Sequence, residues 1–122
     1  MDFYIEFDLD SIKELNLPSS LVEFLKIANA ASPKNDEIKI DSKSYNINNI
    51  LDFNSDAKLE SFRKYMKNFK DILKPSEIIF ARDGFGNVYL LDLDSMIVRF
   101  YDSEVDKKID LISFSEFIKL LG

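Results

Sequence analysis

Two aspartates, Asp92 and Asp94, are the strongest candidates for chemistry in this chain, because they stand two residues apart in a predicted strand. Residues at this spacing share one face of a strand, where two carboxylates can hold a divalent cation between them. A half-exposed strand shows the same alternation of acidic and apolar residues, and no third ligand is recognisable. We therefore expect solvent-facing aspartates rather than a metal site or a catalytic pair.

Histidine and cysteine are both missing from the 122 residues. Their absence removes the usual general base at neutral pH, the thiol nucleophile and the commonest ligands of zinc. Ser19, Ser20 and Ser113 have no recognisable partner base and precede predicted helices, so we interpret them as helix caps. The enzyme alternative that remains is a Mg²⁺ or Mn²⁺ enzyme built on Asp92 and Asp94. We predict a protein that is not an enzyme, with no catalytic, cofactor-binding or metal-binding residue and no cofactor.

The segment Asp83-Gly84-Phe85-Gly86-Asn87 combines residue types found in ion-binding and phosphate-binding loops. It lacks the later acidic ligands and the bidentate glutamate of a calcium loop. It also lacks the third glycine and the Lys-Ser/Thr pair of a phosphate-binding loop. We interpret it as a tight turn between two apolar strands, in which Gly84 or Gly86 adopts a positive φ.

The chain is acidic, with a net charge of −6 and an isoelectric point near 4.6. Nucleic-acid binding needs a basic face, so we expect no nucleic-acid partner. Between residues 83 and 106 a single basic residue, Arg99, stands among six acidic ones, which are Asp83, Asp92, Asp94, Asp102, Glu104 and Asp106. We predict that these six residues contribute to a surface that attracts a basic protein partner, although solubility alone would explain each of them.

The composition, with 46% hydrophobic and 31% charged residues, is that of an ordinary globular protein. The length suits one domain that spans residues 1–122. Apolar runs such as Val88–Leu91 are too short to cross a membrane, and the N-terminus lacks the positive charge of a signal peptide. We therefore expect a cytoplasmic protein without a membrane partner, present as a monomer or a weak dimer.

Periodic patterns predict the elements of the first half of the chain. Residues 3–7 alternate between apolar and polar or charged side chains, which predicts a strand. Ser11 and Glu14 match a capping box before a short helical turn. A helix from Ser20 to Asn29 has one apolar face, and residues 38–47 predict two short strands or one hairpin.

The second half predicts a helix, a sheet and a closing helix. Apolar residues at helical spacing over residues 57–73 predict a helix whose opposite, basic face meets solvent. Residues 78–94 and 97–101 predict a three-stranded antiparallel meander, and Ser113 and Glu116 form a capping box for the last helix. We thus predict an α+β fold with a central antiparallel or mixed sheet packed by helices. The predicted buried residues are Phe24, Phe62, Met66, Phe69, Phe80, Leu91, Val98, Phe114 and Phe117.

Three motifs occur in an order that is typical of one known superfamily. Leu17-Pro18 precedes the helix that ends at Asn29, the hairpin contains Phe80-Ala-Arg-Asp-Gly84, and Ser113-Phe-Ser-Glu-Phe117 begins the last helix. In this order the chain resembles the SUKH superfamily, the Smi/Knr-type proteins that include many bacterial immunity proteins and a fungal cell-wall regulator. The resemblance implies an α+β domain with a central sheet packed by helices.

The resemblance also implies a function that the residues alone do not specify. Such domains are usually non-enzymatic, are often encoded beside a secreted toxin, and neutralise that toxin by direct binding. The toxins are frequently nucleases, whose basic clefts would suit an acidic inhibitor. The expected partner is therefore a cognate protein toxin with a basic surface, and the fungal relative leaves a regulatory or scaffold module as the alternative.

The chain departs from the superfamily pattern at three places. Family members usually have Asn-Gly-Gly at the end of the first long helix, where this chain has Asn29-Ala30-Ala31. Asn29 tolerates the left-handed conformation better than alanine, which favours a turn shifted by a residue. A histidine that is common after the third strand is replaced by Tyr101-Asp102-Ser103-Glu104, and family members often begin with a helix where residues 3–7 alternate.

Overall fold

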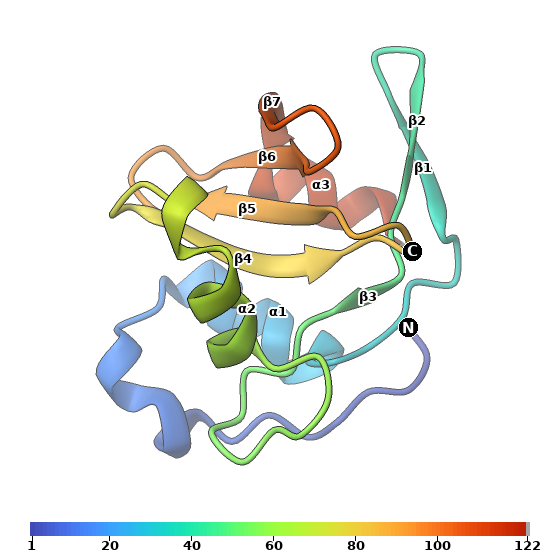
Figure 1. Ribbon diagram of the computed structural model, residues 1–122. Coiled ribbons are helices and arrows are strands. Elements are labelled where there is room, and N and C mark those ends of the chain that lie inside the picture. Colours follow the sequence, from blue (N-terminus) through green and yellow to red (C-terminus); the bar gives the residue numbers. More distant parts are fainter. Residues whose placement is uncertain (122) are drawn as a thin grey trace.

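A five-stranded antiparallel sheet forms the centre of the structure, a computed structural model that describes residues 1–121 without the side chain of Ser11. Its strands lie in the order β3-β4-β5-β6-β7, so neighbours in the sequence are neighbours in the sheet (Figure 1). Their bounds are β3 Asn49–Ile50, β4 Glu77–Arg82, β5 Val88–Asp92, β6 Ile97–Asp102 and β7 Lys107–Ser113. The predicted meander is confirmed as β4, β5 and β6, whereas β7 was not predicted.

Short turns join β4, β5, β6 and β7, whereas two helical segments lie between β3 and β4 in the sequence. In the β4–β5 turn Gly86 has φ +90°, a conformation that an L side chain rarely adopts, which confirms the turn expected there. A separate hairpin, formed by β1 (Glu37–Ile40) and β2 (Lys43–Asn46), projects from the body. Its two turn residues, Asp41 and Ser42, both have positive φ, as a type I′ hairpin turn requires.

Helices cover both faces of the sheet (Figure 1). In this view α1 and α3 lie behind the sheet and α2 lies in front of it. The helical segments are η1 Leu9–Leu15, α1 Ser19–Ala28, α2 Phe62–Asn68, η2 Lys70–Ile72 and α3 Phe114–Leu120, of which η1 and η2 are 3-10 helices. The protein therefore has the α+β architecture that its sequence predicts.

Aromatic rings join α1 and α3 to the sheet. Phe80 of β4 meets Phe114 and Phe117 of α3 edge-on, with ring centroids 5.6 Å apart in both pairs. Phe24 of α1 meets Phe114 at 5.7 Å. Edge-to-face packing of this kind adds stability beyond the burial of apolar area. The residues predicted to be buried are buried, except that Met66 and Phe69 are only partly covered, because α2 is a single short helix on the outer face of the sheet.

The predicted strand over residues 3–7 is wrong. Phe3 has φ +64°, which breaks an extended run, and among residues 1–121 the one β-bridge beside this segment joins Asp2 to Ser32, outside any strand. The helical turn that follows is η1, and the predicted capping box at Ser11 lies outside the described side chains. Residues 5–10, called the N-terminal strap below, instead lie along the outside of the body (Figure 1).

The helix predicted from residue 57 begins five residues later, at Phe62. Ser61 caps it, because its hydroxyl accepts a hydrogen bond from the Lys64 N–H at 3.3 Å. Before the cap, the backbone pairs with Asp52, which donates its N–H to the Glu60 carbonyl and accepts one from Phe62, both at 2.9 Å. These two bonds hold the segment extended, so Leu59 is left 81% exposed instead of joining the core.

Candidate functional site

The six predicted partner-binding acids do not form one cluster, because successive turns of a meander lie at opposite ends of the sheet. Four of them, Asp83, Asp102, Glu104 and Asp106, belong to the β4–β5 and β6–β7 turns at one end. The other two, Asp92 and Asp94, lie at the β5–β6 turn at the opposite end.

At that opposite end, Asp92 belongs to a partly buried network of ion pairs centred on Arg99. Arg99 Nη1 lies 2.7 Å from Asp92 Oδ2 and 3.1 Å from Glu77 Oε2, and its Nε lies 2.7 Å from Asp110 Oδ1. Lys108 completes the network, with its Nζ 2.6 Å from Glu77 Oε1. Four neighbouring strands are thereby joined by charged side chains on one face of the sheet.

The network changes the ionisation of its carboxylates. Hydrogen bonds from Arg99, helped by backbone N–H groups, lower the pKa of Asp92 to about 2. Burial alone would raise the pKa of Glu77, but hydrogen bonds from Lys108 and from the Lys74 N–H lower it below its usual value. Both carboxylates therefore keep their negative charge inside the fold, where the positive charges of Arg99 and Lys108 balance it.

Asp92 is consequently not the solvent-facing aspartate that we expected. It is buried, its Oδ1 accepts the Asp94 N–H at 2.9 Å, and of the two residues only Asp94 is exposed. In the described part of the chain no group of three or more acidic side chains is placed to hold a metal ion. The expectation overlooked Arg99, which lies diagonally across from Asp92 on β6.

Asp83 is buried as well, and it organises the β4–β5 turn. Its Oδ1 accepts the N–H groups of Phe85 and Asn87 at 2.8 and 2.9 Å, and its Oδ2 accepts Asn87 Nδ2 at 2.8 Å. A carboxylate that accepts several such bonds stabilises the turn. Asp83 therefore shapes this end of the sheet but presents little charge to a partner.

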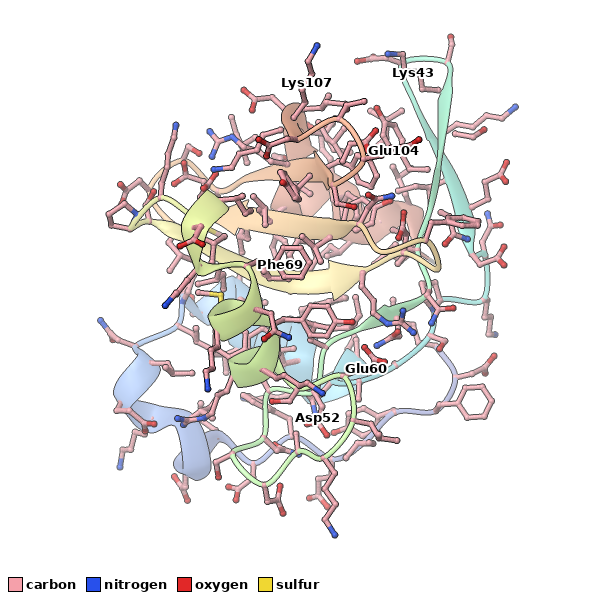
Figure 2. All side chains as sticks on the ribbon, in the orientation of Figure 1. Lys43, Asp52, Glu60, Phe69, Glu104 and Lys107 are labelled. Carbon is pink, nitrogen blue, oxygen red and sulfur yellow. The ribbon has the colours of Figure 1, made fainter. Side chains whose placement is uncertain are left out.

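The acids of the β6–β7 turn belong to a region that we call the turn surface, in which Asp102 is half-buried and Phe85, Glu104, Val105 and Asp106 are exposed. Ser103 joins its two turns, since its N–H donates to Asn87 Oδ1 at 2.9 Å and its hydroxyl donates to the Gly86 carbonyl at 3.2 Å. Phe85 is 78% exposed, and Glu104 lies at the tip of the neighbouring turn (Figure 2). An exposed aromatic ring beside carboxylates is a common composition for a protein-binding surface.

A groove between the N-terminal strap and residues 52–59 is a second exposed feature. It encloses about 760 Å³ and is lined by both acidic and aliphatic side chains. Sequence reasoning missed it, because its walls are brought together by side chains far apart in the chain. One signal was available: Ser61 as a helix cap would have placed Leu59 outside the helix.

The buried polar residues Asn29, Asp52 and Asn54 hold these walls in place. Asn29 does not take the left-handed conformation expected of it, which falls on Ala30 at φ +62°. Its amide instead donates to Asp52 Oδ1 at 3.0 Å and to the Ile5 carbonyl at 3.2 Å. Asn29 thus fixes the strap against the end of α1.

The structure is a small α+β domain with two exposed features, the turn surface and the groove beside the strap. Comparison with protein families finds that the model of SUKH_6, described as SMI1-KNR4 cell-wall, matches residues 8–118. The chain therefore belongs to the SUKH_6 family, as the order of its motifs indicated. The comparisons with curated proteins and with solved structures find no significant match. Among the described residues, no helix combines the length and apolarity needed to cross a membrane.

Proposed function

We propose that this protein is an immunity protein of the cytoplasm that binds a cognate bacterial toxin directly and blocks it without catalysis. The observation that carries the proposal is the family match over residues 8–118, because proteins of this superfamily are commonly immunity proteins. The chain's lack of histidine and cysteine supports a role that needs no chemistry.

The turn surface is the proposed contact for the toxin. Glu104 has no ion-pair partner among residues 1–121, and Phe85 offers an exposed aromatic anchor. Exposed carboxylates steer the approach of a basic surface, such as the substrate cleft of a nuclease. Asp83 supports this surface through the turn, whereas Asp92 and Asp94 lie outside it.

Co-expression tests the proposal most simply. The gene product encoded next to this chain is expressed in a bacterial host with and without it, and survival is counted. We expect the neighbour to kill the host alone and to be tolerated when this chain is present. Killing that co-expression does not relieve would contradict the proposal.

The description of the family model as a cell-wall family favours one second candidate, a regulatory or scaffold module. Such a module would bind another protein of its own cell and would give no protection against a toxin. Purified chain mixed with the neighbouring gene product separates the two candidates. A stable one-to-one complex with that gene product supports the immunity function. A complex formed only with another protein of the same cell supports the regulatory or scaffold function.

A further inference from the structure

The groove beside the N-terminal strap has the properties of a preformed docking site. One wall is the strap, residues 5–10, and the other is the segment of residues 52–59, which run side by side at the bottom of Figure 1. Asn54 joins them: its Nδ2 donates to the Glu6 carbonyl at 2.8 Å, and its Oδ1 accepts the Asp8 N–H at 2.7 Å. Because the fold already orders both walls, a ligand would spend little free energy on ordering them.

Three large aliphatic side chains lie exposed along this groove. Ile5 is 49% exposed, Leu9 is 41% exposed and Leu59 is 81% exposed. Each comes from a segment whose backbone is fixed by hydrogen bonds or by the 3-10 turn η1. Exposed apolar side chains grouped around a groove are characteristic of surfaces that bind another chain.

The charge of the groove specifies the kind of chain that it fits. Five carboxylates line it against a single lysine, Lys58; they are Glu6, Asp8, Asp10, Asp52 and Asp56. A groove of this composition repels anionic ligands such as nucleic acid and favours a cationic segment.

Asp52 offers a cationic ligand a hydrogen-bond acceptor inside the groove. It is only 6% exposed, and its Oδ1 accepts hydrogen bonds from Asn29 Nδ2 and from the Asn54 N–H, both at 3.0 Å. Its Oδ2 accepts no hydrogen bond from the described residues, and the side chain, labelled in Figure 2, is among those that line the groove. Because no buried side-chain oxygen or nitrogen of the described residues lacks a partner, Oδ2 is in contact with solvent. A carboxylate oxygen with free acceptor capacity can exchange its water for the N–H groups of a cationic side chain, and hydrogen bonds between two charged groups are strong.

We propose that the groove binds an extended segment of a partner protein in which a lysine or arginine is flanked by aliphatic residues. The cationic head reaches Asp52 Oδ2 between the two walls, and the flanking aliphatic side chains pack on Ile5, Leu9 and Leu59. Arginine suits this site best, because its planar guanidinium donates several hydrogen bonds and is easily desolvated. The site is separate from the turn surface and does not depend on the partner being a toxin.

A matched pair of triple variants gives the test its control. The groove variant is Asp10→Asn/Asp56→Asn/Leu59→Ser, which removes two exposed carboxylates and one exposed aliphatic side chain. The control variant is Asp36→Asn/Asp94→Asn/Ile27→Ser, which makes the same change in charge and apolarity away from the groove. All six positions are exposed, so both variants should remain folded, which amide spectra and melting temperature verify.

The probe is a short synthetic peptide of alternating arginine and leucine, titrated into the ¹⁵N-labelled protein. We expect saturable shifts of the amide signals of residues 5–10 and 52–59. The groove variant should bind at least about tenfold more weakly than the parent, and the control variant should bind like the parent, because a few anchors carry most of the binding free energy. A peptide of glutamate and leucine should not bind.

Three outcomes would overturn the inference. The arginine peptide could leave the groove signals unmoved, the glutamate peptide could bind equally well, or the two triple variants could lose affinity equally. The result does not depend on the proposed toxin, because the peptide reports on the groove even if the neighbouring gene product proves harmless. If that product is toxic, loss of protection by the groove variant alone would identify the toxin as the source of the segment.

Discussion

The two ends of the central sheet use carboxylates in opposite ways. At the β5–β6 end, Asp92 is buried against Arg99, whose guanidinium also contacts Glu77 and Asp110 within 3.1 Å. At the β6–β7 end, Glu104 stands exposed and has no ion-pair partner among residues 1–121. The same residue class therefore serves the fold at one end and remains available to a partner at the other.

The difference shows why charge counted along a sequence overstates the charge that a partner meets. Asp83 and Asp92 contribute to the acidic stretch of residues 83–106, yet both carboxylates are buried and accept hydrogen bonds within the fold. In contrast, the acidic groove beside the strap is formed by segments far apart in the sequence, so its carboxylates do not form one acidic stretch of the sequence. Accessible charge depends on register and turn geometry, which only the folded chain defines.

The largest effect should come from removing the central cation of the ion-pair network. Arg99→Met leaves Asp92 and the fully buried Glu77 carboxylate without their shared partner, so the free energy of unfolding should fall by about 3–5 kcal/mol. Urea denaturation measures the change. Arg63→Met is the control, because Arg63 pairs with Glu14 on the exposed surface and its loss should have little effect. Equal losses of unfolding free energy in the two variants would show that the buried network contributes no more to stability than an exposed ion pair.

Acid should reveal the same network. The folded pKa of Asp92 is about 2, against an ordinary value of 3.8, so the unfolded state binds its proton first as the pH falls. The stability that Asp92 contributes is present above about pH 4 and is lost as the pH falls toward about 2. Asp92→Asn should therefore be less stable than the parent at pH 5 and should lose less stability between pH 4 and pH 2. Parallel stability curves for the two proteins over that range would contradict the assignment.

A smaller effect should separate the two glycines of the β4–β5 turn, which supports the turn surface. Gly86→Ala places a side chain at φ +90°, so we expect a loss of about 1–2 kcal/mol. Gly84→Ala meets only an ordinary contact with Asn46 Oδ1 at 3.6 Å and should be nearly neutral. Thermal melts of both variants make the comparison. A neutral Gly86→Ala would show that the turn tolerates another conformation.

The sequence predicts those parts of the fold in which an apolar period is regular. The face of α1, the β4–β5–β6 meander and the Ser113 cap, which accepts the Glu116 N–H at 3.3 Å, follow from local pattern. Strand β7 escapes prediction, because its charged residues and a register shift opposite Ile97 and Arg99 obscure the alternation.

The candidate site was less predictable than the fold, for a physical reason. The acids of the β6–β7 turn could be identified from the sequence as an exposed polar turn. The pairing of Asp92 with Arg99 needs the cross-strand register, and the groove needs Asn29 and Asn54 to fasten a distant strap. These contacts join distant segments through single side chains, so no periodic pattern in the sequence indicates them.

The smallest effect on stability should accompany the largest effect on binding. Phe85→Ala/Glu104→Gln changes two exposed side chains of the turn surface, so the free energy of unfolding should change by less than about 0.5 kcal/mol. The control is Ile27→Ala/Asp94→Asn, which makes the same kind of change elsewhere on the surface. Comparable losses of affinity for the product of the neighbouring gene in both variants would show that the turn surface is not a specific contact.

The most direct test of the account is the rate at which the parent and these two double variants associate with the purified product of the neighbouring gene, measured at low and high salt. The account predicts a one-to-one complex in which salt slows association more than it speeds dissociation, because exposed charges are screened over about 8–10 Å. Phe85→Ala/Glu104→Gln should associate more slowly and dissociate faster than the parent, while Ile27→Ala/Asp94→Asn should match it. Tight binding that neither salt nor the turn-surface variant weakens would contradict the claim that accessible acids at this end of the sheet attract the partner.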